Sequence, residues 1–241
     1  YGVMDYFSEL TAFAAGLLFA SILIAPTPTF ETAFSGTRTA TTNIAAVSSQ
    51  GNGALGETHA KISPGDGSTL LNADPFIDTD TQASAKTAKI VAQDFTGDKL
   101  DNKDITYSFR IDGEYVGGPS AGAAMTLATI AAIENRSVPQ DVAVTGTIRS
   151  DGSIGRVGGI LEKAEAAGQN NLKTFYIPEG QEQITYYTQR MDREVIYPGV
   201  YTPEVEYIQR TFSVNNYTQS EYNMTTKEVS DMQELYTDVF E

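Results

Sequence analysis

The distribution of apolar residues divides the chain into an apolar beginning, a mixed middle and a polar end. Residues 10–25 form an apolar run without any charge, which predicts a hydrophobic helix within residues 1–25. Pro26 and Pro28 end this helix, because proline does not continue one, and residues 26–37 are predicted to be a linker. The run is shorter than the about 20 residues that a helix needs to span a bilayer. Two interpretations follow, a membrane anchor and a helix that packs against copies of itself.

Residues 38–200 alternate between segments of strand periodicity and segments of helical periodicity, which is typical of a mixed α and β domain. In the first helical segment, residues 80–97, Asp80 is the expected N-cap and Gly97 the expected stop. Other helices are predicted at residues 119–136 and 160–168, and strands at residues 56–63, 104–111, 141–159 (two strands around an Asp-Gly turn) and 172–178. The predicted fold class is therefore α+β, a mixed sheet with packed helices, preceded by the hydrophobic N-terminal helix.

The end of the chain, residues 201–241, is polar, acidic and rich in tyrosine. We interpret it as a C-terminal extension of the domain. Apolar residues within 225–240 recur at helical spacing, which predicts a terminal amphipathic helix.

Charge and residue usage exclude several classes of function. The formal net charge is −15, with 16 Lys and Arg against 31 Asp and Glu, so the chain repels phosphate backbones and nucleic acid is not an expected partner. Cysteine is absent, which excludes disulfides and thiolate metal sites. Asp74, Asp78 and Asp80 are interpreted as an exposed acidic loop rather than a cation site, and neither a metal nor a cofactor is expected. The single histidine, His59, is expected to be structural or solvated.

Ser120 lies between a Gly-Gly-Pro turn and a long run of small residues, so it is either a nucleophile or the cap of a helix. Backbone N–H groups at a helix start can bind an oxyanion, and Gly118 and Ala121 lie on either side of this serine. Without a serviceable histidine the serine needs another base, and a lysine can serve when desolvation lowers its pKa towards neutrality. Lys163 is the candidate, because its predicted helix has a small, apolar face.

The motifs within residues 117–178 together resemble the proteolytic domain of Lon proteases. That family's pattern is a Gly-Pro-Ser-Ala-Gly turn, a Thr-Gly strand, a Val-Gly-Gly-x-x-Glu-Lys helix and a strand that ends in proline, and all four occur here in this order. The resemblance implies a Lon-like mixed sheet with Ser120 as nucleophile, Lys163 as general base and Thr145 as the residue that helps to position the lysine. It implies a serine endopeptidase whose substrate is unstructured polypeptide.

Two departures from the Lon pattern bear on the level of activity rather than on the dyad. Gly117 stands where Lon enzymes typically have an aspartate, and Thr147 stands where they usually have a glutamate. Residues 51–110 resemble, more loosely, stand-alone archaeal Lon-like proteases, which lack an ATPase module. Because the sequence contains no phosphate-loop pattern, ATP-driven unfolding is not expected from this chain.

The first 25 residues also resemble an archaeal type IV pilin-like N-terminus. Asp5 precedes the apolar run, and in such pilins this acid can pair with the terminal amine of a neighbouring subunit. We therefore keep two hypotheses, an exported or membrane-tethered Lon-like peptidase and a structural subunit of an extracellular filament or surface assembly with the Lon-like domain as its outer head. Self-association as a ring or filament is expected, and residues 1–25 would contact the membrane or a subunit bundle.

Both hypotheses place the chain outside the cell or at its surface. In that location the Asn-x-Ser/Thr triplets at Asn135, Asn216 and Asn223 become candidate glycosylation sites. Two of the three lie in the acidic, tyrosine-rich end of the chain.

Overall fold

The structure is a computed structural model that describes residues 36–48, 50–72, 76–111, 115–197 and 200–241. The hydrophobic helix predicted for residues 1–25 and most of the predicted linker lie outside these residues. No helix in the described ranges is long and apolar enough to cross a membrane. The roles expected of the first 25 residues therefore stay predictions.

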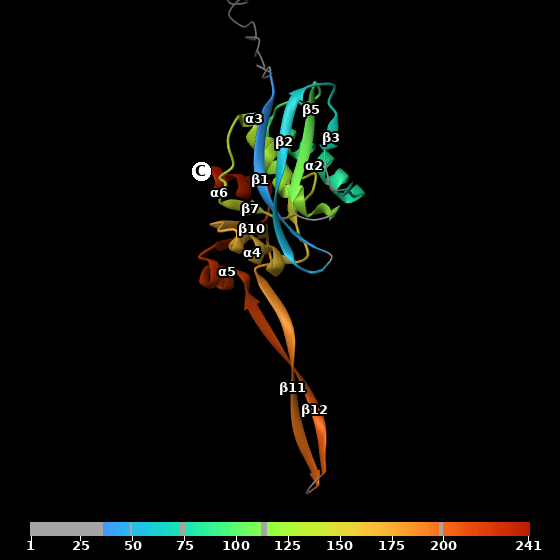
Figure 1. The fold of residues 1–241 in the computed structure, drawn as a ribbon, viewed down its shortest axis with the longest axis vertical. Coiled ribbons are helices and arrows are strands. Elements are labelled where there is room, and N and C mark those ends of the chain that lie inside the picture. Colours follow the sequence, from blue (N-terminus) through green and yellow to red (C-terminus); the bar gives the residue numbers. More distant parts are fainter. Residues whose placement is uncertain (1–35, 49, 73–75, 112–114, 198–199) are drawn as a thin grey trace, which may run out of the picture. The chain divides into compact units, whose positions relative to one another are not determined.

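A seven-stranded mixed sheet forms the centre of the domain (Figure 1). Its strands are β1 (Arg38–Val47), β2 (Gly53–Pro64), β3 (Thr69–Asn72), β5 (Lys103–Ile111), β7 (Val142–Val144), β10 (Thr174–Pro178) and β13 (Thr225–Val229). They lie in the order β13-β10-β7-β1-β2-β5-β3. Antiparallel pairing joins β1 to β2 and β2 to β5, whereas parallel pairing joins β1 to β7, β7 to β10, β10 to β13 and β3 to β5. The predicted mixed sheet is confirmed for the described part of the chain.

Helices pack against the sheet, as the sequence predicted. They are α2 (Thr79–Thr96), α3 (Gly122–Glu134), α4 (Ile160–Gln169), α5 (Val214–Tyr222) and α6 (Met232–Phe240). The helix α3 contacts α2, β1 and β2, and it is buried along residues 122–133. Its small residues allow this depth of burial, because they let neighbouring elements approach closely. A short 3-10 turn, η1 (Pro119–Ala121), leads into α3.

Shorter strands connect these elements. Strands β4 (Phe76–Ile77) and β6 (Tyr115–Val116) pair in parallel, and β8 (Thr147–Ile148) and β9 (Ile154–Gly155) pair antiparallel. The turn between β8 and β9 contains the predicted Asp-Gly pair, and Gly152 has a φ of 84°. That left-handed conformation is the reason why this turn favours glycine.

The start of α2 corrects one prediction. Its N-cap is Asp78, whose side chain accepts a hydrogen bond from the Thr81 backbone, and Asp80 lies inside the first turn instead. Gly97 ends the helix in a left-handed conformation, as predicted. Ile90, in the middle of this helix, is 48% exposed.

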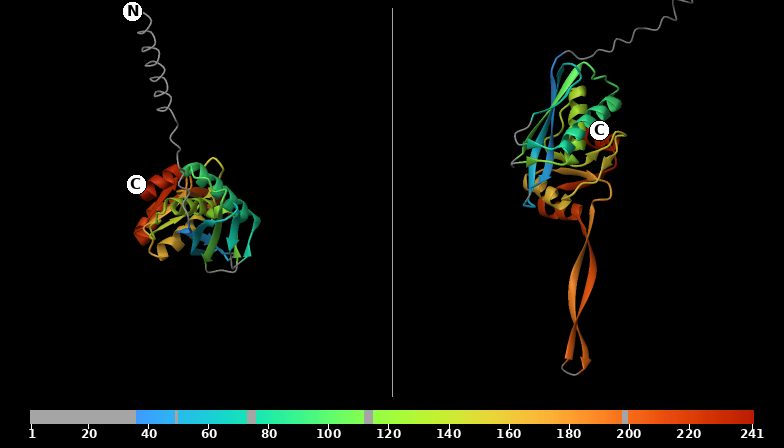
Figure 2. Two further views of the ribbon diagram at one scale, coloured as in Figure 1. Left: turned by 90° about the horizontal axis from the view of Figure 1, so that it is seen from above. Right: turned by 90° about the vertical axis from the view of Figure 1, so that its right-hand side faces the viewer.

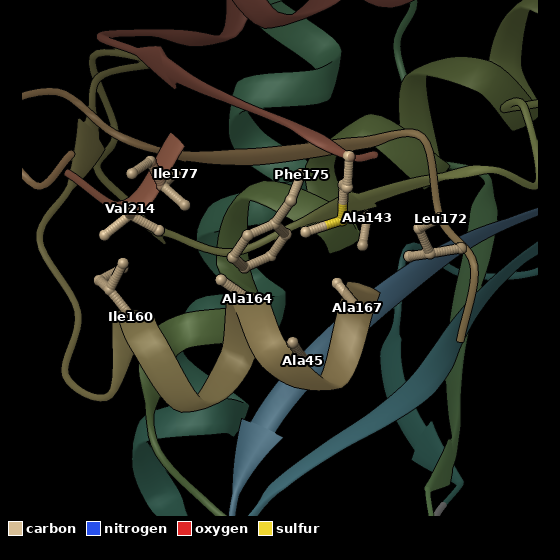
Figure 3. Close-up of a cluster of buried hydrophobic side chains, with 10 residues drawn as sticks. Ala45, Ala143, Ile160, Ala164, Ala167, Leu172, Phe175, Ile177 and Val214 are labelled. Carbon is tan, nitrogen blue, oxygen red and sulfur yellow. The ribbon is translucent and has the colours of Figure 1, made fainter. Parts of the chain in front are cut away.

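Strand β1 is covered on both faces. Successive strand residues point to opposite faces of a sheet, and both Ile44 and Ala45 are buried. Ala45 belongs to a hydrophobic cluster in which α4 packs against Phe175 of β10, and Figure 3 shows Ala164 of α4 beside this ring and Ala167 farther along the helix. The cluster fixes α4, and therefore the lysine that α4 carries, to the middle of the sheet.

The last forty residues differ from the predicted extension. Strands β11 (Gln183–Tyr197) and β12 (Val200–Ser213) form a long antiparallel hairpin, and among the described strands they pair only with each other (Figure 2). Residues 225–229, predicted as the first part of a helix, form β13 beside β10 in the central sheet. Residues 201–241 are therefore not a uniform extension, because residues 225–229 belong to the central sheet and residues 201–213 to the hairpin.

Candidate active site

Ser120 lies in the 3-10 turn that precedes α3, and its side chain is partly exposed. The N-cap of α3 is Ala121, and no side-chain hydrogen bond caps either α3 or the 3-10 turn. The interpretation of Ser120 as a helix cap is therefore wrong. In the described part of the chain, the Ser120 hydroxyl makes no hydrogen bond.

Gly118, two residues before Ser120, is held by the start of α2. Its N–H donates a hydrogen bond to Asp78 Oδ2 at 2.7 Å, and its carbonyl accepts one from Thr81 Oγ1 at 3.0 Å. The other carboxylate oxygen of Asp78, Oδ1, accepts the bond from Thr81 N at 2.8 Å. The Gly118 N–H, a candidate donor to an oxyanion, is thus already engaged by a carboxylate.

The carbonyl of Ser120 joins the serine turn to the segment that follows β7. It accepts hydrogen bonds from Gly146 N at 2.9 Å and from Thr145 Oγ1 at 3.4 Å. Ala123 N in turn donates to the Gly146 carbonyl at 3.0 Å. A Cβ at Gly146 would lie 2.5 Å from Ile154 Cγ2 of β9, so a larger residue at this position would displace the Ile154 side chain.

Lys163 lies in the first turn of α4, and only 4% of its surface is exposed. Its Nζ donates a hydrogen bond to Thr145 Oγ1 at 3.2 Å. Burial lowers the pKa of Lys163 to about 8, because a low-dielectric surrounding disfavours the charged amine, and the neighbouring Glu162 carboxylate opposes this shift. The amine can therefore be neutral at mildly alkaline pH, as a general base must be.

A single buried side chain connects the two predicted dyad residues. Thr145 is fully buried, and its Oγ1 contacts both Lys163 Nζ and the Ser120 carbonyl oxygen. Thr145 N donates to the Tyr176 carbonyl at 3.0 Å, which ties the threonine to β10. The structure thus brings together Ser120, Lys163 and Thr145, with Gly118 and Ala121 in the same turn as the serine.

The remaining candidates lie elsewhere. His59 lies within β2, where its Nδ1 is 2.7 Å from Thr41 Oγ1 and its Nε2 is 3.1 Å from a Glu57 oxygen. The three sequon asparagines, Asn135, Asn216 and Asn223, are exposed, and their glycosylation stays a prediction.

Sequence reasoning missed two sets of hydrogen bonds beside the serine turn and the lysine helix. One is made by the pair Asp78 and Thr81, for which the spacing of an N-cap and its third residue was the available signal. The other is made by Gln181, whose side chain bonds both the N–H and the carbonyl of Val157, at 2.9 and 2.7 Å, just before the lysine helix. No pattern in the sequence indicated that contact. Asp78, which the sequence analysis placed in an exposed acidic loop, is the N-cap of α2. Among the described residues, no three or more His, Cys, Asp or Glu side chains form a group that could hold a metal ion.

Comparison with known proteins relates the middle of the chain to one protein family. Residues 80–191 match the profile of the Lon protease (S16) C-terminal proteolytic domain. The archaeal Lon protease of Archaeoglobus fulgidus is 38% identical over 89 residues, which is 37% of this chain and 14% of that protein. The Lon proteases of Metamycoplasma arthritidis and Desulfatibacillum aliphaticivorans are 42% identical over 66 residues and 35% over 101 residues, or 27% and 42% of this chain.

The matched region is a small part of these relatives, 8% of the Metamycoplasma protein and 12% of the Desulfatibacillum protein. It includes Ser120, Thr145 and Lys163. The family indicates a serine peptidase. The resemblance predicted from the sequence is therefore confirmed: residues 80–191 match the Lon protease C-terminal proteolytic domain, and archaeal Lon proteases are among the proteins similar to this region.

Proposed function

We propose that this chain is a serine endopeptidase that cleaves unstructured polypeptide through a Ser120–Lys163 dyad. The observation that carries the proposal is the buried amine of Lys163, bonded to the same threonine hydroxyl that contacts the Ser120 carbonyl. A lysine in such a place is unusual, because ammonium groups are expensive to bury. Its depressed pKa is the property that a lysine base requires.

The proposed reaction is acyl transfer. Ser120 Oγ attacks the carbonyl carbon of the scissile peptide while neutral Lys163 Nζ takes the hydroxyl proton. The resulting ammonium gives this proton to the leaving amine, and the carbonyl remains bound to Ser120 as an ester. A water molecule, deprotonated by the same amine, then hydrolyses the ester and restores the serine.

The negative oxygen of the tetrahedral intermediate needs N–H donors near Ser120. Because Gly118 N–H is bonded to Asp78, we propose that donors come from the turn after Gly118, where Ala121 lies. This turn is the start of a helix, so its amides face a developing negative charge favourably.

We also propose that the chain acts outside the cell or at its surface, tethered or assembled through residues 1–25. The support is the uncharged run of residues 10–25 in the sequence. The filament hypothesis also assigns the assembly to residues 1–25, as the core of a filament, and it stays a prediction. Negative-stain images of purified chain, with and without residues 1–25, separate the two, since filaments lost on deletion favour assembly.

The test of the proposed function is hydrolysis of a denatured, fluorescently labelled protein by wild type, Ser120→Ala and a matched control, Ser150→Ala, which alters an exposed serine. Wild type and control should cleave at equal rates, and Ser120→Ala should lose activity. The kcat/KM of the wild type should rise with pH through a midpoint near the pKa of Lys163, about 8. Undiminished hydrolysis by Ser120→Ala would refute the proposal.

A further inference from the structure

The start of α2 reaches the serine turn through hydrogen bonds that the proposed chemistry does not use. We propose that Asp78 and Thr81 are positioning residues, which hold Gly118 so that the turn presents the Ser120 hydroxyl to substrate. The inference rests on the proposed peptidase function. We call this set of contacts the Gly118 clasp, made of the Asp78 carboxylate, the Thr81 hydroxyl and the backbone of Gly118.

The clasp holds both polar backbone groups of one residue. Asp78 Oδ2 accepts from the Gly118 N–H at 2.7 Å, and Thr81 Oγ1 donates to the Gly118 carbonyl at 3.0 Å. The Thr81 side chain is fully buried, and its own N–H is bonded to Asp78 Oδ1. One helix start therefore fixes the orientation of this backbone unit at two points.

The conformation of Gly118 explains why such a clasp is needed. Its φ is 88° and its ψ is 160°, a region that is essentially restricted to glycine. A Cβ at this position would meet no atom within 4 Å, so the backbone conformation, rather than a lack of space, restricts this position to glycine. Since glycine has more backbone conformations to choose from than any other residue, the two hydrogen bonds select this one.

The charge on Asp78 suits this role. A carboxylate at a helix N-terminus is favoured by the unsatisfied N–H groups there, and an ionised acceptor makes a stronger bond with a backbone N–H than a neutral one. Asp78 therefore caps α2 and binds Gly118 with separate oxygens. Asp78 and Gly118 are 40 residues apart in the sequence. The hydrogen bond between them therefore joins two distant segments, and it fixes the start of α2 relative to the serine turn.

The test compares Asp78→Asn with Asp80→Asn in the full chain. An asparagine at residue 78 can still cap the helix through its carbonyl oxygen, but its NH2 group cannot accept a bond from Gly118 N–H. Asp80 is exposed and lies in the same first turn, so its variant loses the same charge without touching the clasp. Hydrolysis of the labelled denatured protein gives kcat and KM for each, and thermal unfolding shows whether each variant is folded.

We expect Asp78→Asn to lower kcat about tenfold to a hundredfold, the range for a misplaced reacting group, with KM nearly unchanged. The pH midpoint set by Lys163 should not move, because the contact between Lys163 and Thr145 is intact. Asp80→Asn should behave as the wild type. A kcat for Asp78→Asn equal to that of Asp80→Asn overturns the inference and leaves the proposed function standing.

A second pair of variants decides the question if Asp78→Asn does not fold. Thr81→Ser keeps the hydroxyl and should retain a kcat near that of the wild type, whereas Thr81→Val loses the donor to Gly118 and should lower kcat in the same way as Asp78→Asn. Equal kcat values for Thr81→Val and Thr81→Ser overturn the inference. If the wild type itself shows no hydrolysis that depends on Ser120, the proposed function fails and the inference fails with it.

Discussion

Replacing Lys163 by methionine tests the burial of its amine without any assay of catalysis. Methionine has a similar length and shape and carries no charge. Only 4% of the Lys163 surface is exposed, and burial lowers the pKa of its amine from 10.5 to about 8. The variant should abolish the proposed hydrolysis, since the base is gone, and it should also change how the free energy of unfolding depends on pH.

The sign and size of that change follow from proton linkage. Below pH 8 both folded and unfolded chains hold the proton, so Lys163 contributes no pH dependence. Between pH 8 and 10.5 the unfolded chain still binds a proton that the folded chain has lost, so the free energy of unfolding of the wild type rises with pH. From pH 7 to pH 10 this rise amounts to about 2 to 3 kcal/mol for a pKa near 8.

In Lys163→Met this rise is missing. At pH 7 the free energy of unfolding of the variant should exceed that of the wild type by about 1 to 2 kcal/mol. The variant no longer has to bury an ammonium group, and this gain is larger than the cost of losing one hydrogen bond to Thr145. At pH 10 that advantage should have disappeared or reversed.

Urea unfolding of both proteins, followed by circular dichroism at pH 7, 8, 9 and 10, measures the difference directly. Subtracting the two free energies of unfolding cancels every titrating group that the proteins share. A difference that stays constant from pH 7 to pH 10 would show that the amine has an ordinary pKa, and would refute the reasoning that makes Lys163 a base.

Two further predictions concern the surroundings of Lys163. Thr145→Val removes the hydrogen-bond acceptor of the Lys163 amine, so the pKa should fall further and the rise of kcat/KM should move to lower pH; an unchanged midpoint contradicts this role. The same variant should lower the free energy of unfolding by about 1 to 3 kcal/mol, because a buried amine loses its partner. Gly53→Ala places a Cβ 1.9 Å from the Glu162 carbonyl oxygen, so α4 must shift; we expect a loss of about 1 to 3 kcal/mol in urea unfolding, and wild-type stability would contradict this close packing.

Much of the domain was predictable because local signals agreed with the tertiary fold. Gly97 stops α2 where expected, and α4 ends within one residue of the prediction. The strand at residues 225–229 was not predictable, because its only apolar residue is Val229, too few to show a strand period, and pairing with β10 alone makes it a strand. The long hairpin of residues 183–213 was missed although its strands flank a Pro-Gly pair, because its second half was assigned to the polar extension predicted from residue 201 onwards.

The candidate site likewise contains residues that could be identified from the sequence and contacts that could not. Ser120 and Lys163 could be chosen from sequence because each has an unusual immediate neighbourhood, a Gly-Pro turn for one and a small apolar helix for the other. The roles of Asp78 and Gln181 depend on backbone groups 40 and 24 residues away. No local pattern specifies which backbone unit such a side chain will meet, so these contacts become visible only when the chain is folded.

The contacts around Thr145 explain how a serine and a lysine 43 residues apart in sequence can act together. The Ser120 carbonyl is bonded to Thr145 and Gly146, so the serine turn cannot move away from the end of β7 without losing two hydrogen bonds. The Lys163 amine is bonded to the same threonine side chain, and α4 is packed against β10 through Ala164 and its neighbours. Ser120 and Lys163 are therefore both held by one buried residue, Thr145, which directly follows β7 of the central sheet. Because a packed protein interior deforms little, the spacing between the proposed nucleophile and the proposed base should be set before substrate binds, and the proposed clasp at Gly118 should leave the serine turn with little freedom to rotate.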